Sequence, residues 1–231
     1  MAEAHKRGLQ FHAWMNPYRV TMVGGASQLV PTHPARLHPE WTVFYNNQLM
    51  YNPGIPNVRL FVEEAMMDAV QRYDIDGLHW DDYFYPYPLA GVAFDDDAAF
   101  AAFGQGFTNR GDWRRNNINE LVVEMRKRVR AVKPSVSFGI SPFAVWRNKA
   151  TDPAGSNTTA GCQTYDDLYA DTRAWVRNEW IDYIAPQLYF YIGFPAADYA
   201  QLLPWWADTV QGTNVKLDMG RRRLTWTRNH V

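Results

Sequence analysis

The chain contains 231 residues, of which 47% are hydrophobic and 20% charged, and its formal net charge is −1. This composition excludes a disordered chain and gives no electrostatic signal for a nucleic acid or an anionic membrane as partner. The single cysteine, Cys162, excludes an internal disulfide, and no apolar run approaches the roughly 20 residues of a membrane span.

Apolar residues alternate along the chain between the spacing of a strand and that of a helix. Residues 1–8 indicate the end of a helix and not an export signal. The predicted strands are Leu9–Met15, Ile75–Asp81, Val136–Ser141, Ile181–Leu188 and Val215–Met219, and the predicted helices are Asn57–Tyr73, Trp113–Lys133, Tyr165–Arg177 and Ala196–Val210. Strands that alternate with helices indicate an α/β fold with a parallel sheet, in one domain that covers residues 1–231.

Three long segments, Asn16–Pro56, Asp82–Asp112 and Pro142–Thr164, each follow a predicted strand and precede a predicted helix. Long segments of this kind are usually functional. In a parallel sheet they leave from the carboxyl ends of the strands, where α/β proteins bind their ligands. Within the second segment, the acidic run from Asp95 to Asp97 is interpreted as a solvated loop or a helix N-terminus.

The strand that precedes the second segment carries the most informative residues. It runs directly into Asp81 and Asp82 and then into a loop rich in aromatic rings. Alternation places Leu78 and Trp80 toward the helices and His79 and Asp81 on the opposite face. Acid groups beside flat rings can protonate a sugar oxygen while a ring stacks on the sugar, so this run favours carbohydrate chemistry.

The same alternation on the neighbouring strands predicts a polar rim formed by Asn16, Asp81, Ser141 and Gln187. Arg19, His79, Tyr83 and Tyr189 are further candidates for binding a sugar, and Trp14, Tyr85 and Trp146 are candidate stacking platforms. Structural interpretations stand beside these: either acid can cap a loop, the histidines can be hydrogen-bonded fillers, and the rings, 15% of all residues, can form a core. We assign no metal and no cofactor, because no histidines or acids show ligand spacing.

Five stretches, residues 12–19, 76–86, 112–119, 139–143 and 181–189, resemble the bacterial glycosyl-hydrolase-like 10 family in composition and order. The resemblance implies a (β/α)8 TIM barrel, of which this chain supplies about strands three to seven and lacks the first two and the last. It also implies a location in the cell envelope or outside the cell. At least one family member is a glycosidase that acts on peptidoglycan glycan strands stripped of their stem peptides.

Two carboxyl groups normally catalyse glycoside hydrolysis, but no Asp or Glu follows Met219, and the ending Arg221–Trp226 departs from the family pattern. The second carboxyl therefore lies on a missing strand, or the acetamido oxygen of the sugar attacks the anomeric carbon. In the latter case Asp81 is the general acid/base and Asp82 orients the acetamide, or the reverse. The predicted function is a glycoside hydrolase of an N-acetylated cell-wall glycan. The alternatives are a non-catalytic glycan-binding module, an inactive fragment of such an enzyme, and an amidase or deacetylase.

Overall fold

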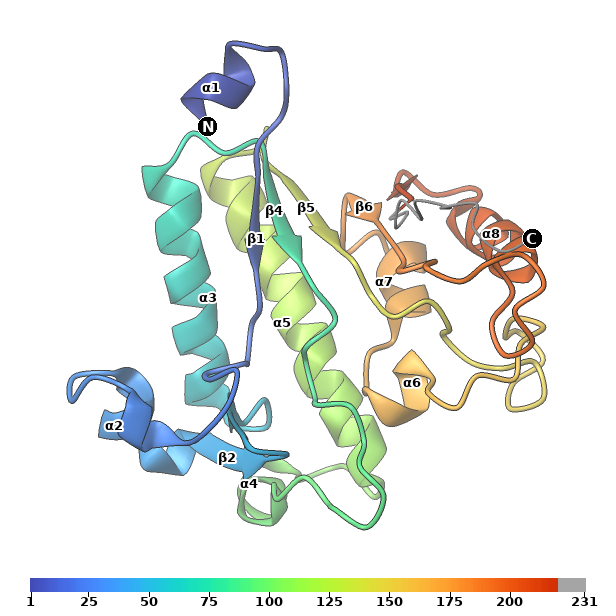
Figure 1. The fold of residues 1–231 in the computed structure, drawn as a ribbon. Coiled ribbons are helices and arrows are strands. Elements are labelled where there is room, and N and C mark those ends of the chain that lie inside the picture. The colour runs from blue at the N-terminus through green and yellow to red at the C-terminus, as the bar shows by residue number, and fades with distance from the viewer. Residues whose placement is uncertain (220–231) are drawn as a thin grey trace, which may run out of the picture.

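Five short parallel strands form the sheet that organises residues 1–219, the part of the chain that the computed structural model describes (Figure 1). The strands are β1 (His12–Met15), β4 (Gly77–Trp80), β5 (Ser137–Ile140), β6 (Tyr183–Ile184) and β7 (Lys216–Leu217), adjacent in that order. The predicted α/β fold with a parallel sheet is confirmed. The segment Arg221–Trp226, whose sequence departs from the family pattern, lies outside the described residues.

Helices connect the strands as the apolar spacing predicts. Helices α3 (Pro56–Arg72) and α5 (Arg110–Val132) lie side by side against the sheet, and α8 (Tyr199–Val210) precedes β7. Pro56 begins α3 at a position where its missing N–H costs nothing. The short α1 (Ala2–His5) lies beyond the opposite end of the sheet from the long loops (Figure 1). Within the described chain, no helix combines the length and apolarity needed to cross a bilayer.

The predicted helix Tyr165–Arg177 is wrong, because the structure divides it into α6 (Thr164–Asp167) and α7 (Thr172–Arg177). Tyr169, between the two, has a φ of 53°, which a helix cannot contain. Asp171 then starts α7 anew, because its side chain accepts a hydrogen bond from the N–H of Ala174.

The first two long segments contain elements that the sequence analysis did not predict. Strands β2 (Thr42–Tyr45) and β3 (Gln48–Tyr51) form an antiparallel hairpin. Its turn residues Asn46 and Asn47 have φ values of 47° and 55°, the conformation that asparagine tolerates in a two-residue hairpin turn. The other additions are η1 (Ala26–Gln28), α2 (Pro34–Leu37), η2 (Pro39–Trp41) and α4 (Asp97–Phe103).

The two faces of the sheet carry different side chains, as the alternation predicts. Leu78 and Trp80 are fully buried in the core on the helix side. On the other face, the hydroxyl of Tyr183 lies 2.8 Å from Nδ1 of both His12 and His79. Gly139 makes room for that ring, because a Cβ at this position would lie 2.2 Å from it. His79 is therefore a hydrogen-bonded filler of this layer, which was the structural alternative to its predicted role in binding sugar.

Candidate active site

The carboxyl ends of β4, β5 and β6 are joined by side-chain hydrogen bonds, and we call this region the strand-end face. Gln187 donates through Nε2 to Oδ1 of Asp81 at 3.0 Å and to the carbonyl of Ser141 at 2.9 Å. The hydroxyl of Ser141 donates to the carbonyl of Ala185 at 2.8 Å. Three of the four residues predicted for the polar rim therefore meet, and Gln187 joins Asp81 to Ser141.

Asp82 turns into the protein beside Asp81 and is only 4% exposed. Its N–H donates to Oδ1 of Asp81 at 3.0 Å, and its own Oδ2 accepts a hydrogen bond from the hydroxyl of Tyr87. Burial raises the pKa of Asp82 to about 6, and the Asp81 charge adds to this rise, while the hydrogen bond from Tyr87 opposes it. Asp82 therefore holds its proton closer to neutral pH than an ordinary carboxyl does.

Asn16, the fourth predicted rim residue, follows β1 at the level of Asp81, because Met15 pairs with Trp80. Its Oδ1 and Nδ2 are both buried, and neither has a hydrogen-bond partner among residues 1–219. A buried polar group without a partner costs roughly 1–3 kcal/mol. The unsatisfied Asn16 amide is thus a costly feature at the carboxyl end of β1, the strand that pairs with the one leading into the acids.

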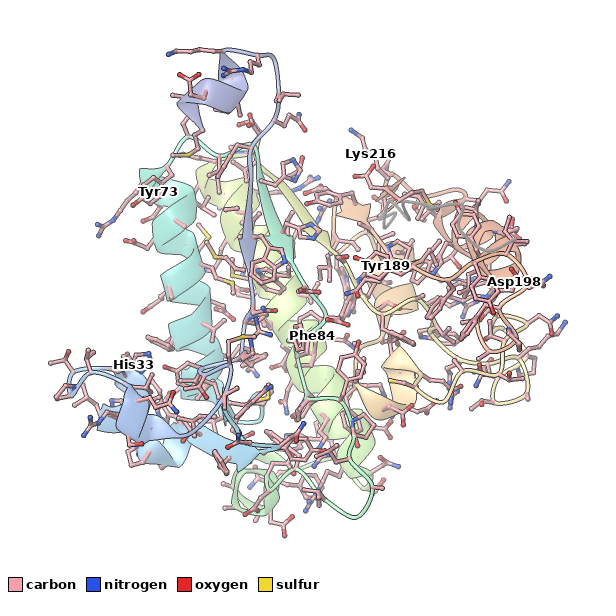
Figure 2. The ribbon with its side chains drawn as sticks, in the orientation of Figure 1. His33, Tyr73, Phe84, Tyr189, Asp198 and Lys216 are labelled. Carbon is pink, nitrogen blue, oxygen red and sulfur yellow. The ribbon has the colours of Figure 1, made fainter. Side chains whose placement is uncertain are left out.

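Aromatic rings continue from the acids across the strand-end face. Successive ring centroids lie 6.2–6.3 Å apart in edge-on contacts along the series Tyr83, Tyr87, Phe143 and Phe190. The guanidinium of Arg19 lies 4.5 Å from the centre of the Tyr83 ring. Tyr189 is 48% exposed, and partial burial together with the charges of Asp81 and Asp82 raises its pKa. Figure 2 labels Phe84 in the segment after β4 and Tyr189 in the segment after β6.

Two of the predicted stacking platforms are wrong, because their rings are buried. Tyr85 is 1% exposed and packs edge-on against Phe94 and Tyr169. Trp146 is 5% exposed, and its Nε1 donates to Asp171 at 3.0 Å. Composition alone could not separate rings that fill a core from rings that line a groove. The third candidate, Trp14, is 55% exposed and remains available to a sugar.

Two groups beside this region, Tyr87 and Asp218, were not among the predicted site residues. Tyr87 lies just beyond the last residue of the stretch that carries the family resemblance, and only its contact with Asp82 singles it out. Asp218 directly follows β7, which ends two residues earlier than predicted. Since Tyr183 pairs with Lys216, alternation puts Asp218 on the face that carries Tyr183. Burial, with the Asp218 charge adding to it, raises the pKa of Tyr183.

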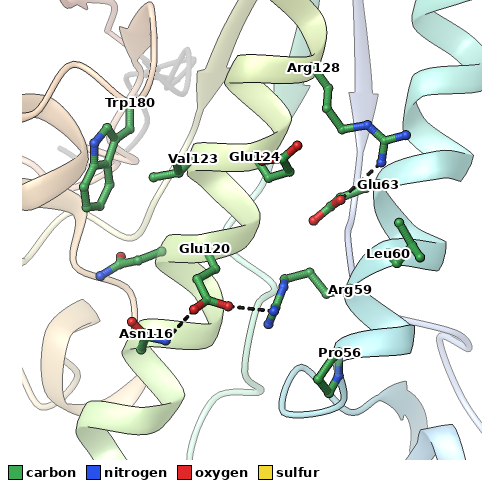
Figure 3. Close-up of a pocket in the computed structure, with 11 residues that line it drawn as sticks. Pro56, Arg59, Leu60, Glu63, Asn116, Glu120, Val123, Glu124, Arg128 and Trp180 are labelled. Carbon is green, nitrogen blue, oxygen red and sulfur yellow. Dashed lines mark hydrogen bonds and ion pairs between the residues drawn. The ribbon is translucent and has the colours of Figure 1, made fainter.

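A cavity of about 670 Å³ lies elsewhere, between α3 and α5 (Figure 3). Its charged side chains neutralise one another, with Arg59 2.6 Å from Glu120 and Arg128 3.1 Å from Glu63. None of the predicted site residues lines it. We therefore attribute it to the packing of the two helices. Among residues 1–219, no group of three or more His, Cys, Asp or Glu side chains is arranged to hold a metal ion.

The raised pKa of Asp82 predicts a stability that depends on pH. The folded protein binds this proton more tightly than the unfolded chain, whose carboxyl has a pKa near 3.8. Stability is therefore greatest below that value and falls as the pH rises toward 6, by up to about 3 kcal/mol. We expect Asp82→Asn to raise the melting temperature at pH 8 and to leave it unchanged at pH 4, as measured by calorimetry. The exposed Asp95→Asn is the control, and equal effects at both pH values would contradict the prediction.

Comparison with known proteins adds to this geometry. Residues 1–226 match the model of the family described as glycosyl hydrolase-like 10. Glycosyl hydrolase YngK of Bacillus subtilis is 53% identical over 221 residues, which cover 95% of this chain and 43% of YngK. Glycosyl hydrolase DigH of Escherichia coli K12 is 41% identical over 227 residues, which cover 94% of this chain and 51% of DigH. The chain spans about half the length of these curated relatives.

Solved structures resemble the chain in fold. A cycloisomaltooligosaccharide glucanotransferase of Paenibacillus matches 93% of this chain and 27% of its own, with 12% identity and a TM-score of 0.51. At this identity the likeness concerns the fold alone. The sequence comparisons are far closer, and they confirm the resemblance that the motifs indicated. The chain therefore belongs to the glycosyl hydrolase-like 10 family.

Proposed function

We propose that this chain is part of a glycosidase that hydrolyses an N-acetylated, peptidoglycan-type glycan of the bacterial cell wall with Asp81 and Asp82. The observation that carries the proposal is the pair itself. Asp82 is buried against Asp81 at the end of a parallel strand, and it holds a proton closer to neutral pH than an ordinary carboxyl does. The substrate implies a location in the cell envelope or outside the cell.

We further propose that residues 1–231 form one domain and belong to a (β/α)8 barrel. The five strands are parallel, and the long loops lie at the carboxyl ends of the strands, which is the arrangement of barrel glycosidases. In the described chain β1 pairs only with β4, and the segment around it exposes Leu9, Phe11 and Trp14. In the proposed barrel, a further strand would pair with this edge and cover Leu9 and Phe11.

The contacts of the two acids favour a division of roles. Asp82, with the raised pKa, gives its proton to the glycosidic oxygen as the bond to the anomeric carbon breaks. Oδ1 of Asp81 is occupied by Gln187 and by the N–H of Asp82, which leaves Oδ2 to accept the N–H of the sugar acetamide. The acetamide oxygen then attacks the anomeric carbon. Water opens the resulting ring after Asp82 takes one of its protons.

Groups around the acids suit a sugar substrate. The amide of Asn16 has no hydrogen-bond partner among residues 1–219, the guanidinium of Arg19 lies over the ring of Tyr83, and Trp14 and Tyr189 expose rings. The same groups would serve a glycan-binding module without catalysis. This second candidate is favoured by the near-complete burial of Asp82, which restricts a substrate's approach to its carboxyl.

Glycan pull-down combined with product analysis separates the two candidates. The full chain is incubated with insoluble cell-wall glycan from which the peptides have been removed. We expect retention on the glycan and new reducing ends that increase with time. Retention without new reducing ends would support the binding module and contradict the glycosidase. Failure to bind or cleave would contradict both.

A further inference from the structure

Within residues 1–219, the hydroxyl of Tyr87 donates a hydrogen bond to the buried side chain of Asp82. This hydroxyl donates to Oδ2 of Asp82, which is 4% exposed. Burial and the neighbouring charge of Asp82 raise the pKa of Tyr87, so the phenol keeps its hydrogen and remains a donor at every pH at which an enzyme works. While Asp82 is ionised, the hydroxyl of Tyr87 is therefore the donor.

Tyr87 is itself held in place by the β2–β3 hairpin, which is inserted between β1 and α3. The hydroxyl of Tyr45, on β2, donates to the carbonyl of Tyr87 at 3.2 Å and accepts the N–H of Leu89 at 2.7 Å. Tyr45 is 5% exposed, and its ring lies 6.0 Å from that of Phe94. One buried hydroxyl thus fixes the backbone of the loop on both sides of Pro88.

Neighbouring aromatic rings pack against the ring of Tyr87 on two sides. It packs edge-on between Tyr83 and Phe143, at centroid distances of 6.3 and 6.2 Å. Phe143 belongs to the segment after β5, and it forms an isolated bridge with Gln187, the residue that holds Asp81. The contacts that orient the two acids therefore meet around one ring.

We propose that Tyr87 is the positioning residue that orients Asp82, and that the hairpin sets its place through Tyr45. This inference rests on the proposed function of the acid pair and deepens it. A hydrogen bond to a carboxylate favours the ionised form, so Tyr87 limits how far burial raises the pKa of Asp82. Tyr45 lies 42 residues before Tyr87 in the sequence. Through this contact the hairpin influences Asp82, the proposed proton donor.

The test is a pH titration of Asp82 in the full chain. The protonation of Asp82 is monitored by NMR of aspartate carboxyls labelled with ¹³C. Asp82→Asn identifies the signal. We expect Tyr87→Phe to move the midpoint of Asp82 upward by about one pH unit, because a buried carboxylate loses a donor. Tyr45→Phe is expected to produce a smaller shift in the same direction. Tyr165→Phe, at a half-buried ring outside this network, is the control and should produce none.

An unchanged titration of Asp82 in Tyr87→Phe would overturn the inference. A loss of thermal stability that is equal at all pH values, with no shift in the titration, would likewise reduce Tyr87 to a packing role. The titration does not depend on turnover, so it tests the role of Tyr87 whether or not the chain cleaves a glycan. A shifted titration in a chain that cleaves no glycan would keep Tyr87 as the positioning residue and refute the glycosidase. In an active chain, the alkaline limb of the pH–rate profile should move upward with the midpoint.

Discussion

Replacing Asp82 by Asn in the full chain is expected to reduce cleavage of an N-acetylated cell-wall glycan by about 10²–10⁴-fold. The amide keeps the shape of the side chain and can still accept the hydroxyl of Tyr87, but it cannot give a proton to the leaving oxygen. Asp81→Asn is expected to cause a loss of similar size, because the acetamide is no longer oriented. Initial rates of reducing-end formation measure both effects.

The wild-type rate should also fall as the pH rises through about 6, because Asp82 then loses the proton that it must donate. Asp95→Asn, in an exposed part of the loop after β4, is the matched control and should leave the rate unchanged. Asp218→Asn tests the mechanism, since Asp218 follows β7 and lies three strands from Asp81. Attack by the acetamide requires Asp218→Asn to retain most of the activity. A loss as large as that of Asp82→Asn would instead make Asp218 the second carboxyl.

Replacing Arg114 by Ala is expected to destabilise the chain by about 3–5 kcal/mol. Arg114 donates through Nε and Nη2 to both carboxylate oxygens of Asp96, at 2.7 and 2.6 Å. Asp96 has no exposed side-chain surface, so removal of Arg114 would leave a buried charge with only Arg110, 3.4 Å away, beside it. Burial opposes the charged form of Arg114, but the hydrogen bonds and charge of Asp96 outweigh it and raise its pKa. Denaturation in urea measures the change in the free energy of unfolding.

Arg130→Ala is the control for that loss. Arg130 contacts Asp182 at 2.9 Å but is 57% exposed, and Asp182 retains Arg126 at 2.5 Å. Exposed pairs of this kind contribute about 1 kcal/mol or less. The double variant Arg114→Ala with Asp96→Ala should be more stable than Arg114→Ala alone, since the unpaired charge has gone. Equal costs for Arg114→Ala and Arg130→Ala would show that the buried pair is not critical.

Local periodicity was sufficient to predict the sheet and the orientation of its strands. Leu78 and Trp80 fill the core, because period two assigns faces independently of distant contacts. The predicted strand Ile181–Leu188 is too long, since β6 ends at Ile184, and Gln187 reaches Asp81 from the segment that follows it. The hairpin was missed although Asn46 and Asn47 are residues that favour its turn. Asp96 could not be predicted to be buried, because its partner Arg114 belongs to a helix with a mostly polar sequence. Such pairings arise only once the fold brings the segments together.

The shared hydroxyl of Tyr183 restricts how this layer of the protein can evolve. A phenol has one hydrogen, so at any moment it can donate to only one of His12 and His79. Gly139 is tied to the two imidazoles by the space that the phenol ring occupies. Substitution at any one of these four positions leaves a group without its complement, so we expect homologues to exchange them as a set.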